Sequence, residues 1–419
     1  MEYMDLISLL ILCATLVAAF VFKLNSGLVA IAVSVLLARV VGIGDKTLFS
    51  YFDSKLFVML MGVMFLFSIA QENKTLELVA KKTFALCKGN AKVLPIVLFF
   101  VSAVISAIGP GLISVTALVS VLIVSLANEV KTPAIRLVPF GLMGAFAGGL
   151  SPVTPTGVVA IEQAAKNNIT GVEATTPWMM ALTCFIFSVI LYFFVFKWHK
   201  EKATPVEQNA DAQGSKESFS AKQIATLVGV LVVAVVSSVF NINVGLVSIV
   251  VAVLLLIFKC ADEGAALKKM PWGTLVMITG VGILISLVTE LGGIDLLSEG
   301  LKKLSTDKTI AAIMTLLSGV MSWVSSASGV VMPTLIPTVP SLVADMPGAN
   351  ALELVSCISI GANMAAISPL SSCGGLMLAA YTSSGNVSAK DRNKMFLQLF
   401  LLSASALLLS GILALLGLY

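Results

Sequence analysis

Long apolar runs, separated by short polar segments, cover most of the chain. A helix needs about 20 apolar residues to cross a bilayer, and runs near that length predict spans at residues 6–22, 27–41, 56–70, 135–161 and 178–196 of the first half. Residues 76–91 mix lysines and a glutamate with apolar residues, which is typical of an amphipathic helix lying in the membrane interface. The pattern therefore predicts a membrane protein that crosses the bilayer several times.

Residues 93–127 form an apolar run that is interrupted at its middle by Gly109-Pro110-Gly111. Each arm has about 15 to 17 residues, which is short of the usual ~20 for a span. We therefore expect a re-entrant hairpin whose tip lies near the midplane of the bilayer. Residues 310–344 predict a second hairpin, with its tip at residues 325–329.

A Ser-Pro pair flanked by glycines stands inside two further apolar runs, at residues 144–157 and 361–374. Proline removes a backbone donor and glycine weakens the helix beside it, so each pair predicts a helix that breaks inside the membrane. Non-helical backbone at that depth is tolerated only where protein buries it or where it lines a watery cavity. Two breaks at matching positions therefore predict a binding site.

The two halves of the chain repeat the same pattern. Residues 22–31 are echoed by residues 240–249 at an offset of 218, which also aligns Ser68 with Ser286 and Glu72 with Glu290. The offset stays near that value, at 216 through the hairpins and 217 through the breaks, which indicates an internal duplication. We expect repeat 1 at residues 1–199, a flexible polar linker at 200–221 and repeat 2 at 222–419, with broken helices at 135–161 and 352–381.

The predicted fold class is an all-α polytopic membrane protein with two inverted-topology repeats, each with five spans and one re-entrant hairpin. An odd number of crossings inverts the second repeat, and the distribution of Lys and Arg tests this independently. With the linker in the cytoplasm, the inner loops hold 19 of these residues and the outer loops hold 7. This asymmetry predicts a cytoplasmic linker and external termini, in the inner (cytoplasmic) membrane of the cell.

The overall composition excludes a soluble domain, since 58% of the residues are apolar and 11% are charged, with a mean hydropathy of +1.03. Six cysteines are scattered without a Cys-x-x-Cys pair, which indicates small apolar residues and not a metal or disulfide site. The single histidine, His199, follows the end of a span and is expected in the interface. We expect no cofactor, no metal beyond a coupling cation, and no nucleic-acid partner.

Apart from Arg39 and Arg136 near the ends of their runs, the runs assigned to the membrane core contain no Asp, Lys or Arg, which disfavours a proton relay or a pump driven by decarboxylation. Two hairpin tips and two broken helices instead supply helix N-termini, which suit anions, and hydroxyl and carbonyl oxygens, which suit Na+. An anionic substrate coupled to a cation fits both kinds of group. The alternative is that these small residues only let helices pack closely.

The predicted site residues come from the two hairpin tips and the two helix breaks. The substrate is expected to contact Gly109, Pro110, Gly111, Ser151, Pro152, Thr154, Thr156, Ser325, Ser326, Ser328, Gly329, Ser368, Pro369, Ser371 and Ser372. The coupling cation is expected at Ser106, Gly109, Ser114, Gly149, Thr154, Ser322, Ser325, Ala366 and Ser371.

With these motifs in place, the chain resembles the ion transporter superfamily of divalent anion:Na+ symporters over essentially its whole length, in particular the MatC-like dicarboxylate (malonate) carriers. In that family the hairpin tips carry Ser-Asn-Thr motifs that contact substrate carboxylates and Na+. The tips here read Gly109-Pro110-Gly111 and Ser325-Ser326-Ala327, without the asparagines. The resemblance further implies a homodimer whose transport domain moves as an elevator.

Together these observations predict a secondary active transporter for a C3–C4 dicarboxylate of the malonate, malate or succinate type, coupled to Na+. Coupling to H+ or exchange of another organic anion are alternatives. So is the large membrane subunit of a TRAP transporter, which would need a separate soluble binding protein. An enzyme would need titratable groups such as His with Asp or Glu at depth, and the sequence offers none there. A channel fits poorly, because hairpins entering from opposite faces suit alternating access better than a continuous pore.

Overall fold

The computed structural model describes residues 3–85, 92–200, 218–240, 242–383 and 387–419, and within these ranges it contains helices and no β-strand. The α-helices are α1 (Met4–Val21), α2 (Ser26–Val41), α3 (Asp45–Ser50), α4 (Ser54–Glu72), α5 (Thr75–Ala85), α6 (Leu94–Ala107), α7 (Gly111–Glu129), α8 (Val138–Gly149), α9 (Pro155–Lys166), α10 (Val172–Ile190), α11 (Ala221–Phe240), α12 (Val244–Ile257), α13 (Glu263–Lys269), α14 (Trp272–Glu290), α15 (Gly293–Leu304), α16 (Ile310–Val324), α17 (Met332–Leu335), α18 (Val339–Asp345), α19 (Ala351–Met364), α20 (Ser372–Ser383) and α21 (Ala389–Leu415).

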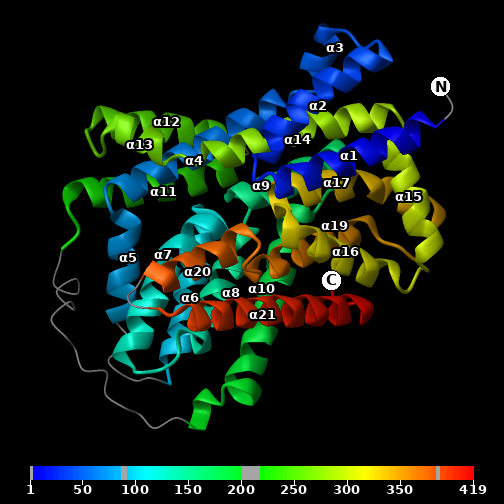
Figure 1. Cartoon of the computed structure of the whole chain (residues 1–419). Coiled ribbons are helices and arrows are strands. Elements are labelled where there is room, and N and C mark those ends of the chain that lie inside the picture. The colour runs from blue at the N-terminus through cyan, green and yellow to red at the C-terminus, as the bar shows by residue number, and fades with distance from the viewer. Residues whose placement is uncertain (1–2, 86–91, 201–217, 241, 384–386) are drawn as a thin grey trace.

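These helices form two layers (Figure 1). One layer holds α1, α2, α4, α11, α12 and α14, and the other holds α6, α8, α10, α16, α19 and α21. The short helices α9 and α17 lie between the layers, where α9 contacts α4 and α17 contacts α14. The second half of the first broken helix, α9, and the helix that follows the second hairpin tip, α17, therefore lie where the two layers meet.

Many large apolar side chains are exposed on the outer surface of the protein. Leu36, Val40, Val239 and Leu408 are exposed by 60% or more of their area, and soluble proteins rarely show such residues in large contiguous patches. Eight helices within the described ranges are long and apolar enough, by length and composition, to cross a membrane. This arrangement is that of a multi-pass membrane protein, as the sequence predicts.

Both predicted hairpin tips coincide with turns between helices. Gly109 and Gly111 have φ angles of 139° and 74°, in the region that L-residues rarely adopt, and they separate α6 from α7. At the second tip, α16 ends at Val324, Ser325 and Ser326 are extended, and a π-helical turn at Ala327–Val331 follows. Local backbone chemistry thus sets both turns.

Both Ser-Pro segments interrupt a helix. The first lies between the end of α8 at Gly149 and the start of α9 at Pro155. The second lies between a short 3-10 turn at Ala365–Ile367, which follows α19, and the start of α20 at Ser372. The chain is therefore non-helical at both places that the sequence predicts.

The first layer is joined by two close helix crossings, α2 on α14 and α4 on α12. A Cβ atom added to Gly280 would lie 2.4 Å from the carbonyl oxygen of Gly27, and one added to Gly62 would lie 2.1 Å from that of Gly245. Residues 27 and 245, like 62 and 280, are 218 positions apart. The same crossing therefore occurs twice, and each copy pairs one helix from each half of the chain.

Asparagines at equivalent positions begin α2 and α12. Asn25 Oδ1 accepts a hydrogen bond from Gly27 N and Asn243 Oδ1 accepts one from Gly245 N, each at 2.9 Å. Asn25 Nδ2 also donates to Gly273 O at 2.7 Å, a contact between residues 248 positions apart. These caps fix where each helix enters its crossing.

Two predictions fall partly on residues outside the described ranges. Most of the predicted linker, residues 201–217, lies outside them, and so do residues 86–91 of the predicted interfacial helix, of which α5 covers Thr75–Ala85. The linker, the boundaries of the two repeats and their orientation in the membrane stay predictions.

Candidate functional site

Two adjoining cavities lie where the hairpin tips approach the helix breaks. The first cavity has a volume of about 50 Å³ and is lined by Met64, Phe67, Ser68, Gln71, Gly109, Pro110, Gly111, Leu112, Ile113, Ser114, Pro155, Thr156, Lys269, Pro271, Thr274 and Ser328. The second cavity has a volume of about 30 Å³ and is lined by Leu112, Ile113, Thr156, Ser322, Ser325, Ser326, Ala327, Ser328, Asn363, Ala366, Ser371, Ser372 and Cys373. Leu112, Ile113, Thr156 and Ser328 belong to both walls, so the two cavities are neighbours that share one partition.

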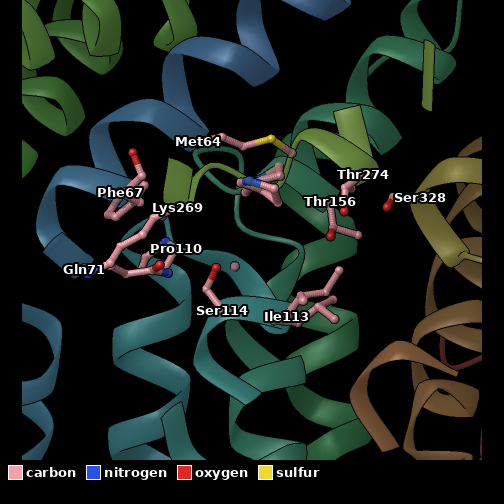
Figure 2. Close-up of a pocket in the computed structure, with 16 residues that line it drawn as sticks. Met64, Phe67, Gln71, Pro110, Ile113, Ser114, Thr156, Lys269, Thr274 and Ser328 are labelled. Atoms are coloured by element: carbon pink, nitrogen blue, oxygen red, sulfur yellow. The ribbon is translucent and has the colours of Figure 1, made fainter. Parts of the chain in front are cut away.

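The first cavity lies between the two layers. Its wall combines the C-terminal half of α4, the first hairpin tip, the start of α9 and the segment joining α13 to α14. In Figure 2, Gln71, Lys269 and Pro110 group on one side, and Thr156, Thr274 and Ser328 group on the other. The N-terminus of α7, at Gly111, also reaches this wall, and the first N–H groups of a helix have no partner within the helix. The site therefore offers hydroxyls, amides and one ammonium.

The second cavity contains a buried side-chain oxygen without a partner. Asn363 is 1% exposed, and its Nδ2 donates to Ser359 O at 2.7 Å. Its Oδ1 has no hydrogen-bond partner among the described residues. Leaving a buried acceptor unsatisfied costs about 1–3 kcal/mol, so an oxygen of this kind at a cavity wall indicates a place for a cation or an ordered water.

The structure brings some of the predicted site residues together and leaves others out. Those that line the two cavities are Gly109, Pro110, Gly111, Ser114, Thr156, Ser322, Ser325, Ser326, Ser328, Ala366, Ser371 and Ser372. Ser151 and Pro152 line a separate apolar groove beside Trp178. The remaining predicted residues line neither cavity: Ser106, Gly149, Thr154, Gly329, Ser368 and Pro369.

Thr154 and Ser371 brace the two helix breaks in the same way. Thr154 Oγ1 donates to the carbonyl oxygens of Gly149 and Ser151, at 2.7 and 2.8 Å. Ser371 Oγ donates to the matching carbonyls of Ala366 and Ser368, at 2.5 and 2.9 Å. A broken helix leaves its last carbonyls without helical partners. These hydroxyls supply that partner in both copies.

We expect Thr154→Val to destabilise the protein. The variant loses the hydroxyl that also accepts from Gly157 N at 3.1 Å, and loss of such a cap costs about 0.5–2 kcal/mol. Thermal unfolding of the purified protein in detergent should show a lower Tm for this variant, whereas Thr154→Ser should keep it. An unchanged Tm combined with a raised half-saturating substrate concentration would instead make the hydroxyl a ligand, as the sequence predicts.

Sequence reasoning missed five polar residues at the cavity walls, of which Ser68 and Thr274 supply hydroxyls. Gln71, Lys269 and Asn363 were assigned no role in binding, although Lys269 is the one charged side chain among the residues lining either cavity. The lysine was counted only as a loop charge. The offset of 218 aligns Lys269 with Tyr51, just as it aligns Glu290 with Glu72. The signal in the sequence is therefore a positive charge in one repeat where the other repeat has a neutral residue.

Comparisons with known proteins agree with a transporter fold. A family model described as "CitMHS: Citrate transporter" matches residues 16–361. The crystal structure of the YdaH transporter of Alcanivorax borkumensis, described as having an unusual topology, aligns with a TM-score of 0.58 over 89% of this chain and 87% of that chain. Its sequence identity of 12% makes this a likeness of fold alone. No curated protein gives a significant match to the chain.

Proposed function

Because the chain belongs to the citrate transporter family, we propose that it is a secondary transporter for small organic anions that carry two or three carboxylates. The C3–C4 dicarboxylates that the sequence suggests and the citrate named in the family description share this chemistry. The resemblance to MatC-like carriers supports the smaller substrates. The family is one of membrane transporters and not of enzymes.

The observation that carries the proposal is the meeting of two hairpin tips and two helix breaks around two adjoining cavities. The N-terminus of α7 at Gly111 and that of α9 at Pro155 both lie at the wall of the first cavity. The positive ends of two helix dipoles stabilise an anion there, each by about 0.3–2 kcal/mol depending on burial. Lys269 adds a full positive charge on the same wall.

We assign coupling to Na+, with the second cavity as its site. The Asn363 side-chain oxygen has no partner among the described residues, and Ser322 and Ser325 place hydroxyls on the same wall. Neutral oxygens of this kind are ligands for a hard cation. The residues lining the two cavities include no carboxylate and no imidazole, which favours Na+ over H+ as the coupling ion.

The two cavities as they stand are too small for the proposed substrates. At about 50 and 30 Å³ they hold a few waters each, so a dicarboxylate enters only when the lining elements separate. Two ion pairs join the start of α4 to α9 between the layers, Lys55 to Glu162 at 2.9 Å and Lys166 to Asp53 at 2.5 Å. We propose an elevator-type movement of one layer against the other, within a homodimer, that breaks and remakes such contacts.

Proteoliposomes containing the purified protein are expected to accumulate labelled malonate, succinate, malate or citrate when an inward Na+ gradient is imposed. Uptake should fall several-fold when the gradient is collapsed and should be absent from protein-free liposomes. A carrier that moves none of these anions under any gradient would contradict the proposed substrate class. Uptake driven by a pH gradient and indifferent to Na+ would contradict the cation assignment alone.

A further inference from the structure

Lys269 belongs to an ion pair at the edge of the first cavity. Its Nζ lies 2.6 Å from Glu72 Oε2, and the two side chains are exposed by 45% and 24%. Lys269 ends α13 and Glu72 ends α4, so the pair joins the ends of two neighbouring helices. The lysine lines the cavity and the glutamate does not.

The other half of the chain contains an equivalent pair with a different donor. Tyr51 aligns with Lys269 and Glu290 aligns with Glu72 at the offset of 218, and the Tyr51 hydroxyl donates to Glu290 Oε2. Burial and this hydrogen bond raise the pKa of Tyr51 to about 12, so the tyrosine remains a neutral donor. The duplication thus keeps the carboxylate in both copies and places a positive charge in only one.

A positive charge is not needed to tie these two helix ends together. The tyrosine makes the same connection to Glu290 as a neutral group, and exposed ion pairs contribute only about 0–1 kcal/mol of stability. The charge of Lys269 is therefore better explained by what enters the cavity that its side chain lines. Within that wall, no other lining residue can offer a full charge to an anion.

We propose that Lys269 is the receptor for one carboxylate of the transported anion, and that Glu72 holds its ammonium until the anion arrives. This inference rests on the proposed function. In the absence of substrate the half-exposed Lys269 is paired with Glu72. A bound anion that closes the cavity takes the ammonium out of contact with water, which is costly unless the ammonium is paired. The arriving carboxylate replaces Glu72, so the ammonium exchanges one partner for another.

The exchange predicts a preference for substrates with two or more carboxylates. One carboxylate occupies Lys269, and a second reaches the free N–H groups at the start of α7 and the Ser114 hydroxyl on the same wall. A monoamide has one carboxylate and can place it at the start of α7 without using Lys269. Removing the lysine charge should therefore weaken the binding of a dicarboxylate much more than the binding of its monoamide.

Isothermal calorimetry on the purified full-length protein tests the exchange. Malonate, succinate, malate and citrate are each titrated into the unmodified protein in Na+ buffer, and the tightest binder and its monoamide are carried forward. Lys269→Gln is expected to raise the Kd of that anion at least tenfold and the Kd of its monoamide less than threefold. Glu72→Gln is expected to leave the Kd unchanged or lower it, because it removes the internal competitor. Lys269→Arg should bind within threefold of the unmodified protein.

A matched control is Lys302→Gln, which removes a lysine paired with Asp345 that lines neither cavity, and it should leave the Kd unchanged. Equal Kd values for Lys269→Gln and the unmodified protein would overturn the inference, as would equal weakening by Lys269→Gln and Glu72→Gln. An unmodified protein that binds none of the four anions would contradict the proposed function itself, so the two failures are distinguishable. The Tm of each variant is measured alongside, and Lys269→Arg keeps the test decisive if Lys269→Gln unfolds.

Discussion

Replacing Asn363 by leucine is expected to weaken Na+ binding during substrate transport strongly while leaving the protein folded. Leucine has the same number and branching of side-chain heavy atoms as asparagine and lacks the side-chain oxygen that has no partner among the described residues. We expect the half-saturating Na+ concentration for uptake in proteoliposomes to rise at least tenfold. Substrate affinity should fall with it, because coupling between two ligands is reciprocal.

Asn363→Asp and Ser359→Ala are the controls for that variant. The aspartate keeps an oxygen at the cavity and should retain Na+ dependence. Ser359 also has a buried hydroxyl without a partner among the described residues, but it does not line either cavity, so its removal should change nothing. If Asn363→Leu keeps the Na+ dependence of the unmodified protein, the cation binds elsewhere in the protein.

A second large effect is expected from Gly280→Ala at the crossing of α2 and α14. The added Cβ would lie 2.4 Å from the carbonyl oxygen of Gly27, so the two backbones would have to separate. Overpacking of this kind costs typically about 1–3 kcal/mol, and more where backbone must move. We expect a markedly lower Tm and a smaller monodisperse fraction in size-exclusion chromatography.

Gly282→Ala provides a control on the same helix. A Cβ at residue 282 meets no atom within 4 Å, and replacing glycine by alanine in a helix stabilises it by about 0.5–1 kcal/mol. The two variants should therefore change the Tm in opposite directions. Equal stability of both variants would mean that α2 and α14 do not depend on this close contact.

The parts of the fold that local backbone chemistry decides could be predicted from the sequence. Glycines with positive φ set the first hairpin tip at Gly109 and Gly111, and the Ser-Pro pairs end α8 and α19 where proline and glycine rules place the break. Each of these features needs only neighbours in sequence. The two equivalent glycine crossings depend on contacts between the two halves of the chain and are found only in the structure.

The parts of the site that depend on tertiary placement could not be predicted. Ser151 and Thr156 flank the same break, yet Ser151 lines a separate apolar groove while Thr156 lines both cavities. The direction in which each faces depends on how α9 leaves the break. Lys269 looked like an ordinary loop charge because only the packing of α13 against α4 brings it to the cavity.

The paired glycine crossings also have a consequence for biosynthesis. Asn25 and the start of α2 contact Gly273, 248 residues later in the chain. At about 5–20 residues per second, that partner emerges from the ribosome about 12 to 50 s after α2. During this interval the surface of α2 around Gly27 has no native partner, so the first half of the chain cannot complete its folding alone. The nascent protein must therefore remain in the membrane, protected from aggregation and proteolysis, until α14 has been inserted beside it.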